Sequence, residues 1–171
     1  MSKASARTRV DTETANGDRA VEADRAAEDA WGALLRVHAA LVPILDRELQ
    51  AANRLSLAWY DVLLELNSAP DRRLRMSELG ERVTLSRTRV SRLVDELTAA
   101  GLVERQANPE DRRSAYAALT GSGRTLFRQA APTYQRGIRE HFGAALSADE
   151  VAAIRDGLGR VVSHTAGRTP A

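Results

Sequence analysis

The chain of 171 residues contains no cysteine, which excludes disulfides, thiol redox sensing and thiolate metal ligands within it. It also lacks an apolar run long enough to cross a membrane and an apolar signal-peptide core near its first residues. A Gly-rich phosphate loop and a His-Glu-x-x-His zinc pattern are absent too, and the three histidines, His38, His141 and His164, are scattered. We therefore expect a cytoplasmic protein that is not an enzyme and holds no cofactor or metal.

Charge is nearly balanced, at a formal net +2, and Lys3 is the sole lysine among the basic residues. A protein with so small an excess binds a polyanion only if its positive side chains are concentrated on one surface. The length predicts one domain of ordinary size with a real hydrophobic core.

Residues 76–120 carry the most informative pattern, a pair of helices joined by a tight turn. Ser86 is a good N-cap for the second helix, because its hydroxyl can accept a hydrogen bond from a free backbone N–H. Gly101 is placed to end that helix in a left-handed conformation. Gly80 is small and predicts close approach of the two helices. The apolar side chains that fall where crossed helices would bury them are Leu79, Val83, Leu85, Val90, Leu93, Val94 and Leu97.

The opposite face of the second helix is polar and basic. It consists of Ser86, Arg87, Thr88, Arg89, Ser91 and Arg92, and residues 82–94 include no acidic side chain. Positive groups at a helix N-terminus, where the helix dipole is also positive, suit phosphates and the edges of guanine. An ordinary solvated helix surface is the alternative interpretation, because arginine is common on helices.

A basic hairpin follows the helix pair and favours the nucleic-acid interpretation. Residues 102–105 and 115–119 predict two short strands around a polar loop, 107–114, which carries Asp111, Arg112 and Arg113. A helix-turn-helix followed directly by such a hairpin is the winged-helix layout. Residues 72–75 are a basic connector that predicts a short third strand.

The stretch Ser77 to Arg105, together with Asp111-x-Arg113 and Leu119-Thr120, resembles the MarR family of bacterial regulators. The similarity runs from about Trp31 to Val162. The resemblance implies a homodimeric winged-helix transcription factor, often a ligand-responsive repressor, on an inverted-repeat operator in double-stranded DNA. It also implies that residues 86–92 enter the major groove and that Arg113 enters the minor groove, with Asp111 orienting the wing.

The predicted fold is mostly α with a small β-hairpin wing. We expect a disordered or weakly helical arm (1–27), an N-terminal dimerisation helix (28–54), the winged helix-turn-helix region (55–119), C-terminal dimerisation helices (120–164) and a tail (165–171). The arm has too few large apolar residues to bury much surface. The first and last helices carry apolar stripes that exceed what the winged-helix segment can cover, so two copies of the chain are expected to cover each other.

A small-molecule effector is a further hypothesis. Aromatic and polar side chains in the first two predicted helices suit an aromatic or anionic ligand: Trp31, His38, Trp59, Tyr60 and Asp61. Aromatic residues on helices more often belong to the core, so a structural role is the competing interpretation. Two other functions stay open, a winged-helix module that binds proteins and a metal-responsive regulator.

The absence of cysteine generates a test of how such a regulator would be controlled. Hydrogen peroxide is expected to cause no release of DNA that a thiol reductant reverses, because the chain has no thiol to oxidise. The measurement is a DNA-binding titration before peroxide, after peroxide and after added dithiothreitol. Release that dithiothreitol reverses would contradict the prediction.

Overall fold

The structure is a computed structural model that describes residues 4–83, 85–109, 111 and 114–166, with side chains described from residue 21 to residue 165 of these ranges. The chain divides into two compact units, residues 1–41 and 42–171. Among the described residues, no helix is long and apolar enough to cross a membrane.

The first helix, α1 (Ala4–Asn53), begins much earlier than the sequence indicated. The predicted start at residue 28 is wrong, because residues 4–27, expected to form a disordered or weakly helical arm, are helical in the structure. The reason lies in local propensity: this stretch is rich in alanine and arginine, which favour helix, and it lacks proline. The helix also continues past Pro43, whose carbonyl oxygen accepts a hydrogen bond from Arg47 Nε (3.2 Å).

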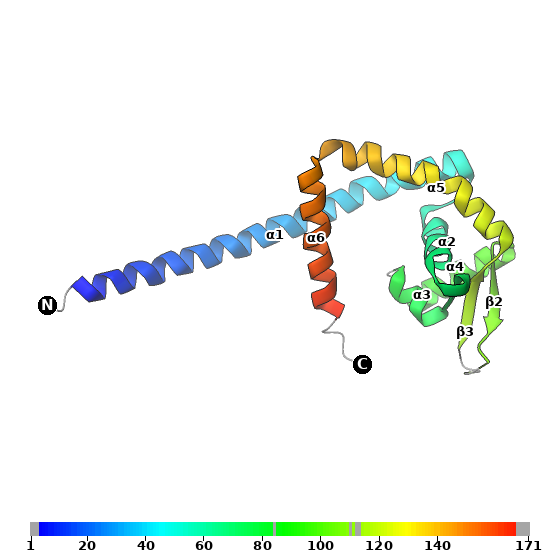
Figure 1. The fold of residues 1–171 in the computed structure, drawn as a ribbon, viewed down its shortest axis with the longest axis horizontal. Coiled ribbons are helices and arrows are strands. Elements are labelled where there is room, and N and C mark those ends of the chain that lie inside the picture. The colour runs from blue at the N-terminus through cyan, green and yellow to red at the C-terminus, as the bar shows by residue number, and fades with distance from the viewer. Residues whose placement is uncertain (1–3, 84, 110, 112–113, 167–171) are drawn as a thin grey trace. The chain divides into compact units, whose positions relative to one another are not determined.

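The second unit contains the predicted helix-turn-helix and hairpin (Figure 1). Figure 1 shows α2, α3 and α4 gathered beside the hairpin of β2 and β3. The three strands form an antiparallel sheet in the order β1-β3-β2, so the predicted third strand is confirmed. The elements are α2 (Leu57–Ser68), the 3-10 turn η1 (Pro70–Arg72), β1 (Arg73–Arg75), α3 (Met76–Arg82), α4 (Arg87–Ala99), β2 (Val103–Ala107) and β3 (Ala115–Leu119).

The core of this unit lies between the helices and one face of the sheet. The predicted apolar stripe on α4 is confirmed, because Val90, Leu93, Val94 and Leu97 are all buried. They share one cluster with residues from α1, α2, α3 and all three strands, among them Leu49, Leu63, Leu79, Leu74, Val103 and Ala117. Burial of such side chains contributes roughly 1.5–3 kcal/mol each. The stripe therefore fixes which face of α4 remains exposed.

Gly80 and Gly101, the two glycines singled out in the sequence, lie at the α3–α4 crossing and at the end of α4. A Cβ added to Gly80 would lie 3.6 Å from both Leu85 O and Val90 Cγ2, which is ordinary van der Waals contact. The position thus lies within contact distance of Val90 on α4, in agreement with the predicted close approach of the two helices, and it has room for a methyl group. Gly101 has φ +71°, as predicted for the residue that ends α4.

A hydrogen-bonded junction joins the end of α4, both wing strands and the helix that follows. Thr120 Oγ1 lies 2.8 Å from Gly101 O and 3.0 Å from Leu102 O, and it accepts a hydrogen bond from Gly123 N (3.0 Å). The backbone N–H of Thr120 also donates to Leu102 O (3.1 Å). Thr120 is thus the N-cap of α5 (Gly121–His141).

The α5 helix packs on α2 and is followed by the C-terminal helix. The Tyr60 ring lies 5.4 Å from that of Phe127 and 4.5 Å from that of Tyr134, centroid to centroid. After the 3-10 turn η2 (Gly143–Ala145), α6 (Ala148–Ala166) begins with a capping box. In it, Ser147 N donates to Glu150 Oε2 (2.8 Å) and Glu150 N donates to Ser147 Oγ (3.3 Å).

Gly123 leads to a test of this packing. A Cβ at this position would lie 2.1 Å from Leu102 O and 2.8 Å from Leu119 Cδ1, so the base of the wing must shift to admit it. Gly123→Ala is expected to lower the free energy of unfolding by ~1–3 kcal/mol, measured by urea denaturation. Gly121→Ala is the matched control, because nothing lies within 4 Å of a Cβ there. Equal stability of the two variants would contradict the prediction.

Candidate nucleic-acid interface

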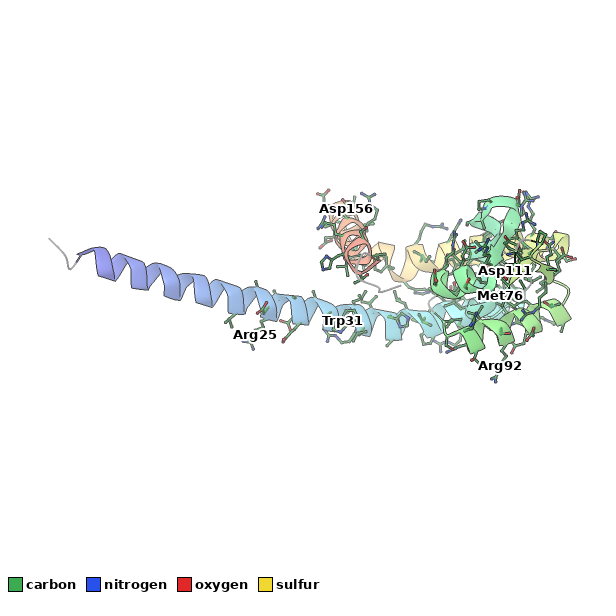
Figure 2. All side chains as sticks on the ribbon, turned by 90° about the horizontal axis from the view of Figure 1, so that it is seen from below. Arg25, Trp31, Met76, Arg92, Asp111 and Asp156 are labelled. Carbon is green, nitrogen blue, oxygen red and sulfur yellow. The ribbon has the colours of Figure 1, made fainter. Side chains whose placement is uncertain are left out.

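The N-terminal half of α4 presents most of the basic residues that the sequence singled out. Ser86 caps the helix by accepting a hydrogen bond from Arg89 N (3.4 Å), as predicted. Arg87, Thr88 and Arg89 are exposed in the first turn. Figure 2 shows Arg92, one turn further along, pointing away from the rest of its unit. The exposed end of α4 thus combines arginine side chains with the positive end of the helix dipole.

Two hollows accompany this basic face. One is a shallow depression of about 450 Å³ on α4 itself, lined by Arg87, Thr88, Ser91, Arg92 and Asp95. The other is a pocket of about 310 Å³ between α3, α4 and the hairpin, lined by Met76, Ser77, Arg87, Ser91, Arg105, Ser114 and Ala115. Arg87 and Ser91 line both, so the basic face of α4 continues toward the wing.

The described part of the wing loop is ordered by hydrogen bonds. Asn108 is buried, and its Nδ2 donates to Ser114 Oγ (2.7 Å). Ser114 in turn donates to Asp111 O through both its backbone N–H (3.0 Å) and its hydroxyl (3.2 Å). Asp111 is exposed. Arg112 and Arg113, predicted to contact DNA, lie outside the described residues.

Arg105 belongs to this surface, although the sequence reasoning did not select it. Its side chain reaches from β2 to α4, where Nε and Nη2 donate to Asp95 Oδ1 (3.0 and 2.8 Å). Nη2 also donates to Ser91 Oγ (3.0 Å) and lies 3.3 Å from Ser91 O. Ser91, predicted to face DNA, is half-buried and engaged by Arg105. Its hydroxyl has another lone pair and its own proton available.

A sequence signal for this contact exists in the strand periodicity. Val103 is buried, and Arg105 follows two positions later, so both side chains point to the same face of the sheet. In the register of the sheet Arg105 lies opposite the buried Ala117. An arginine at this strand position can reach Ser91 and Asp95, which lie four residues apart on one side of α4.

The residues predicted to bind an effector fall into both units. Trp31 and His38 are exposed in the unit that ends at Leu41. In the second unit, Trp59 is half-buried and its indole Nε1 donates to Glu96 Oε2 (3.1 Å), which links α2 to α4. Tyr60 is buried, in agreement with the competing interpretation that it belongs to the core.

Asp61 is the electrostatically unusual member of this group. Burial, with a smaller contribution from the Glu65 carboxylate, raises the pKa of Asp61 to about 6. Burial and then Asp61 raise the pKa of Tyr134 above its ordinary value. Burial also raises the pKa of Tyr60 to about 12, with Tyr134 and Asp61 adding to the effect. Neutral tyrosines therefore surround a carboxyl group that exchanges its proton near neutral pH.

The described residues offer no cluster of side chains suited to a metal ion. Among the described residues, no group of three or more His, Asp or Glu side chains is arranged to hold a metal ion. His141 instead pairs with Glu48, with 2.6 Å between Nε2 and Oε1.

A helix pair with arginines at the exposed start of its second helix, followed by an antiparallel hairpin, defines a winged helix-turn-helix protein. Comparison with known proteins makes the class more specific. Residues 55–114 match the model of the MarR family. Sco3205, a MarR family transcriptional regulator from Streptomyces coelicolor solved in complex with DNA, is 30% identical, with a TM-score of 0.72 over 84% of this chain and 89% of that one. The chain belongs to the MarR family, and the family resemblance seen in the sequence is confirmed.

Two further relatives support this assignment. AbsC, another MarR family transcriptional regulator from Streptomyces coelicolor, is 29% identical with a TM-score of 0.74, over 82% of this chain and 94% of that one. The transcriptional repressor MprA of Escherichia coli K12 is 33% identical over 88 residues, which are 52% of this chain and 49% of MprA. The matched region thus spans about half the length of the curated relatives.

The raised pKa of Asp61 predicts how stability depends on pH. Between its ordinary pKa of 3.8 and about 6, the unfolded chain has lost this proton while the folded chain keeps it, so raising the pH favours unfolding. Asp61→Asn is therefore expected to gain stability over the parent as pH rises from 4 to 7, by on the order of 3 kcal/mol at most. Thermal unfolding across this range measures it, with Asp156→Asn on exposed α6 as control. Parallel stability curves for parent and Asp61→Asn would contradict it.

Proposed function

We propose that this protein is a sequence-specific regulator of transcription that binds double-stranded DNA through α4 and the wing. The observation that carries the proposal is the exposure of Arg87, Arg89 and Arg92 on one end of α4, opposite the buried apolar stripe. An α-helix fits the major groove, and arginine can donate two hydrogen bonds to one guanine. Arg112 and Arg113 in the wing are proposed to reach the neighbouring minor groove, with Asp111 orienting the loop.

We propose further that the protein acts as a homodimer on an inverted-repeat operator. Apolar side chains are exposed in both units: Trp31, Leu34, Leu35 and Val37 on α1, and Val151, Leu158, Val161 and Val162 on α6. A two-fold pairing of chains would remove this surface from water. It would also set the two α4 helices about one DNA turn apart, ~34–36 Å, so that both could read one face of the duplex.

Repression and control by a reversible ligand complete the proposal. The relative MprA is named as a transcriptional repressor, which supports repression, and the match covers 49% of its length. An effector would act by binding a form of the dimer with misplaced α4 helices more tightly than the DNA-competent form. Among the predicted ligand contacts, Asp61 is supported by its raised pKa, because perturbed groups are common at functional sites.

A footprint tests the function directly. The full chain is titrated onto the DNA upstream of its own gene and onto a scrambled duplex of equal length and composition, at one fixed salt concentration. Protection of an inverted repeat at protein concentrations that leave the scrambled duplex free is the expected result. Equal affinity for both duplexes would overturn sequence-specific regulation and favour a winged-helix module that binds other proteins.

The arginines of α4 are expected to differ from one another. Arg89→Ala, at the residue we assign to base contact, is expected to lose ~1–3 kcal/mol on the operator and to relax sequence preference. Loss of a phosphate contact, expected for Arg87→Ala or Arg92→Ala, would weaken binding to all duplexes and lower the salt dependence by about one counterion. Fluorescence anisotropy at several salt concentrations separates the two classes. Arg128→Ala, at an exposed position of α5, is the control. Equal losses on operator and random DNA for Arg87→Ala, Arg89→Ala and Arg92→Ala would refute base contact by arginine.

A further inference from the structure

We propose that Arg105 is a positioning residue that holds the wing against the DNA-reading helix and thereby sets sequence specificity. The proposal rests on the proposed DNA-binding function and deepens it. It assigns Arg105 a role through Asp95 and Ser91 rather than through contact with DNA.

The geometry of the contact is that of a brace between two elements. Arg105 leaves β2, the first strand of the wing, and both Nε and Nη2 donate to the same oxygen, Asp95 Oδ1 (3.0 and 2.8 Å). Nη2 also donates to Ser91 Oγ (3.0 Å), one helical turn closer to the exposed arginines of α4. Because a guanidinium is planar, these bonds fix the direction of the side chain as well as its distance.

The brace lies between the two surfaces proposed to contact DNA. Ser91 is flanked by Arg87 and Arg92 on the face of α4 and lines the pocket that separates α4 from the wing. Strand β3 of the wing pairs with β1 of the same domain. The loop at the other end of the wing must keep its angle to α4 if the protein is to contact both grooves together. A small rotation of β2 moves the loop tip, and the contact from Arg105 to α4 opposes that rotation.

Charge distinguishes this arginine from those proposed to bind phosphate. The Arg105 side chain is 34% exposed and is paired with a carboxylate, whereas Arg87, Arg89 and Arg92 are exposed with no ion pair found among the described residues. Arg105 with Asp95 is thus close to neutral as a pair. Removing Asp95 makes the surface more positive, so simple electrostatics predicts tighter binding to every DNA. Loss of positioning predicts lower specificity instead.

The decisive comparison uses three variants. Asp95→Ala removes the acceptor. Asp95→Asn makes the same change of charge but keeps an amide oxygen that can accept from Nε and Nη2. Glu104→Ala is the matched control, since it removes one negative charge beside Arg105 on β2, and its hydrogen bond from Gln106 Nε2 stays within the strand. Each is measured on the best duplex selected by the parent from a random-sequence pool and on a scrambled duplex.

The expected outcome is a fall of about tenfold in the ratio of specific to random affinity for Asp95→Ala, the size expected when a charged hydrogen bond is lost. Asp95→Asn and Glu104→Ala are expected to stay within about twofold of the parent. If the ratio for Asp95→Ala remains within twofold of that for Glu104→Ala, or Asp95→Asn falls as far as Asp95→Ala, positioning by this hydrogen bond is wrong.

A measurement without DNA separates failure of this proposal from failure of the proposed function. Hydrogen exchange of the β2 amides, residues 103–107, is expected to be at least about fivefold faster in Asp95→Ala than in the other two variants, while exchange in α4 stays the same. Unchanged β2 exchange would overturn the brace. If the pool yields no preferred duplex but β2 exchange responds as expected, the brace stands and sequence-specific binding is what fails.

Discussion

The α4 helix, the wing and α5 all depend on one hydrogen-bonded junction. Thr120 caps α5 through Gly123 N, and its hydroxyl contacts the carbonyl oxygens of Gly101 and Leu102, where α4 ends and the wing begins. Leu102 N also donates back to Leu97 O (2.9 Å) in the last part of α4. Backbone atoms that would each need a partner when buried therefore satisfy one another at one point, and the directions of the three elements are set together.

The basic surface follows from this constraint and from burial. With Val90, Val94 and Leu97 packed in the core, the arginines of α4 can only face outward. The junction at Leu102 holds the base of the wing, and Arg105 holds the middle of β2 against α4. The hairpin is therefore attached at two separate positions along this strand.

The sequence predicts well what local patterns determine. The stripe on α4, the cap at Ser86 and the left-handed Gly101 each depend on a few neighbouring residues, and all were confirmed. Predictions failed where distant geometry or weak propensity decides. The start of α1 depends on summed small preferences. Arg105 was missed because its partners come from another element, although its place on the same face of β2 as the buried Val103 pointed toward the helices.

The bond from Trp59 to Glu96 makes the protein its own spectroscopic reporter. The indole N–H of α2 is tied to the C-terminal half of the helix whose other end carries the exposed arginines. Displacement of α4 from α2 breaks that bond and wets the half-buried ring, which moves its emission to longer wavelength. Trp31, 61% exposed on α1 in a single chain, lies on the surface that the proposed homodimer would cover, so its emission would report the pairing of chains. The two tryptophans thus give separable signals, so movement of the arginine-bearing helix can be followed without attaching a label.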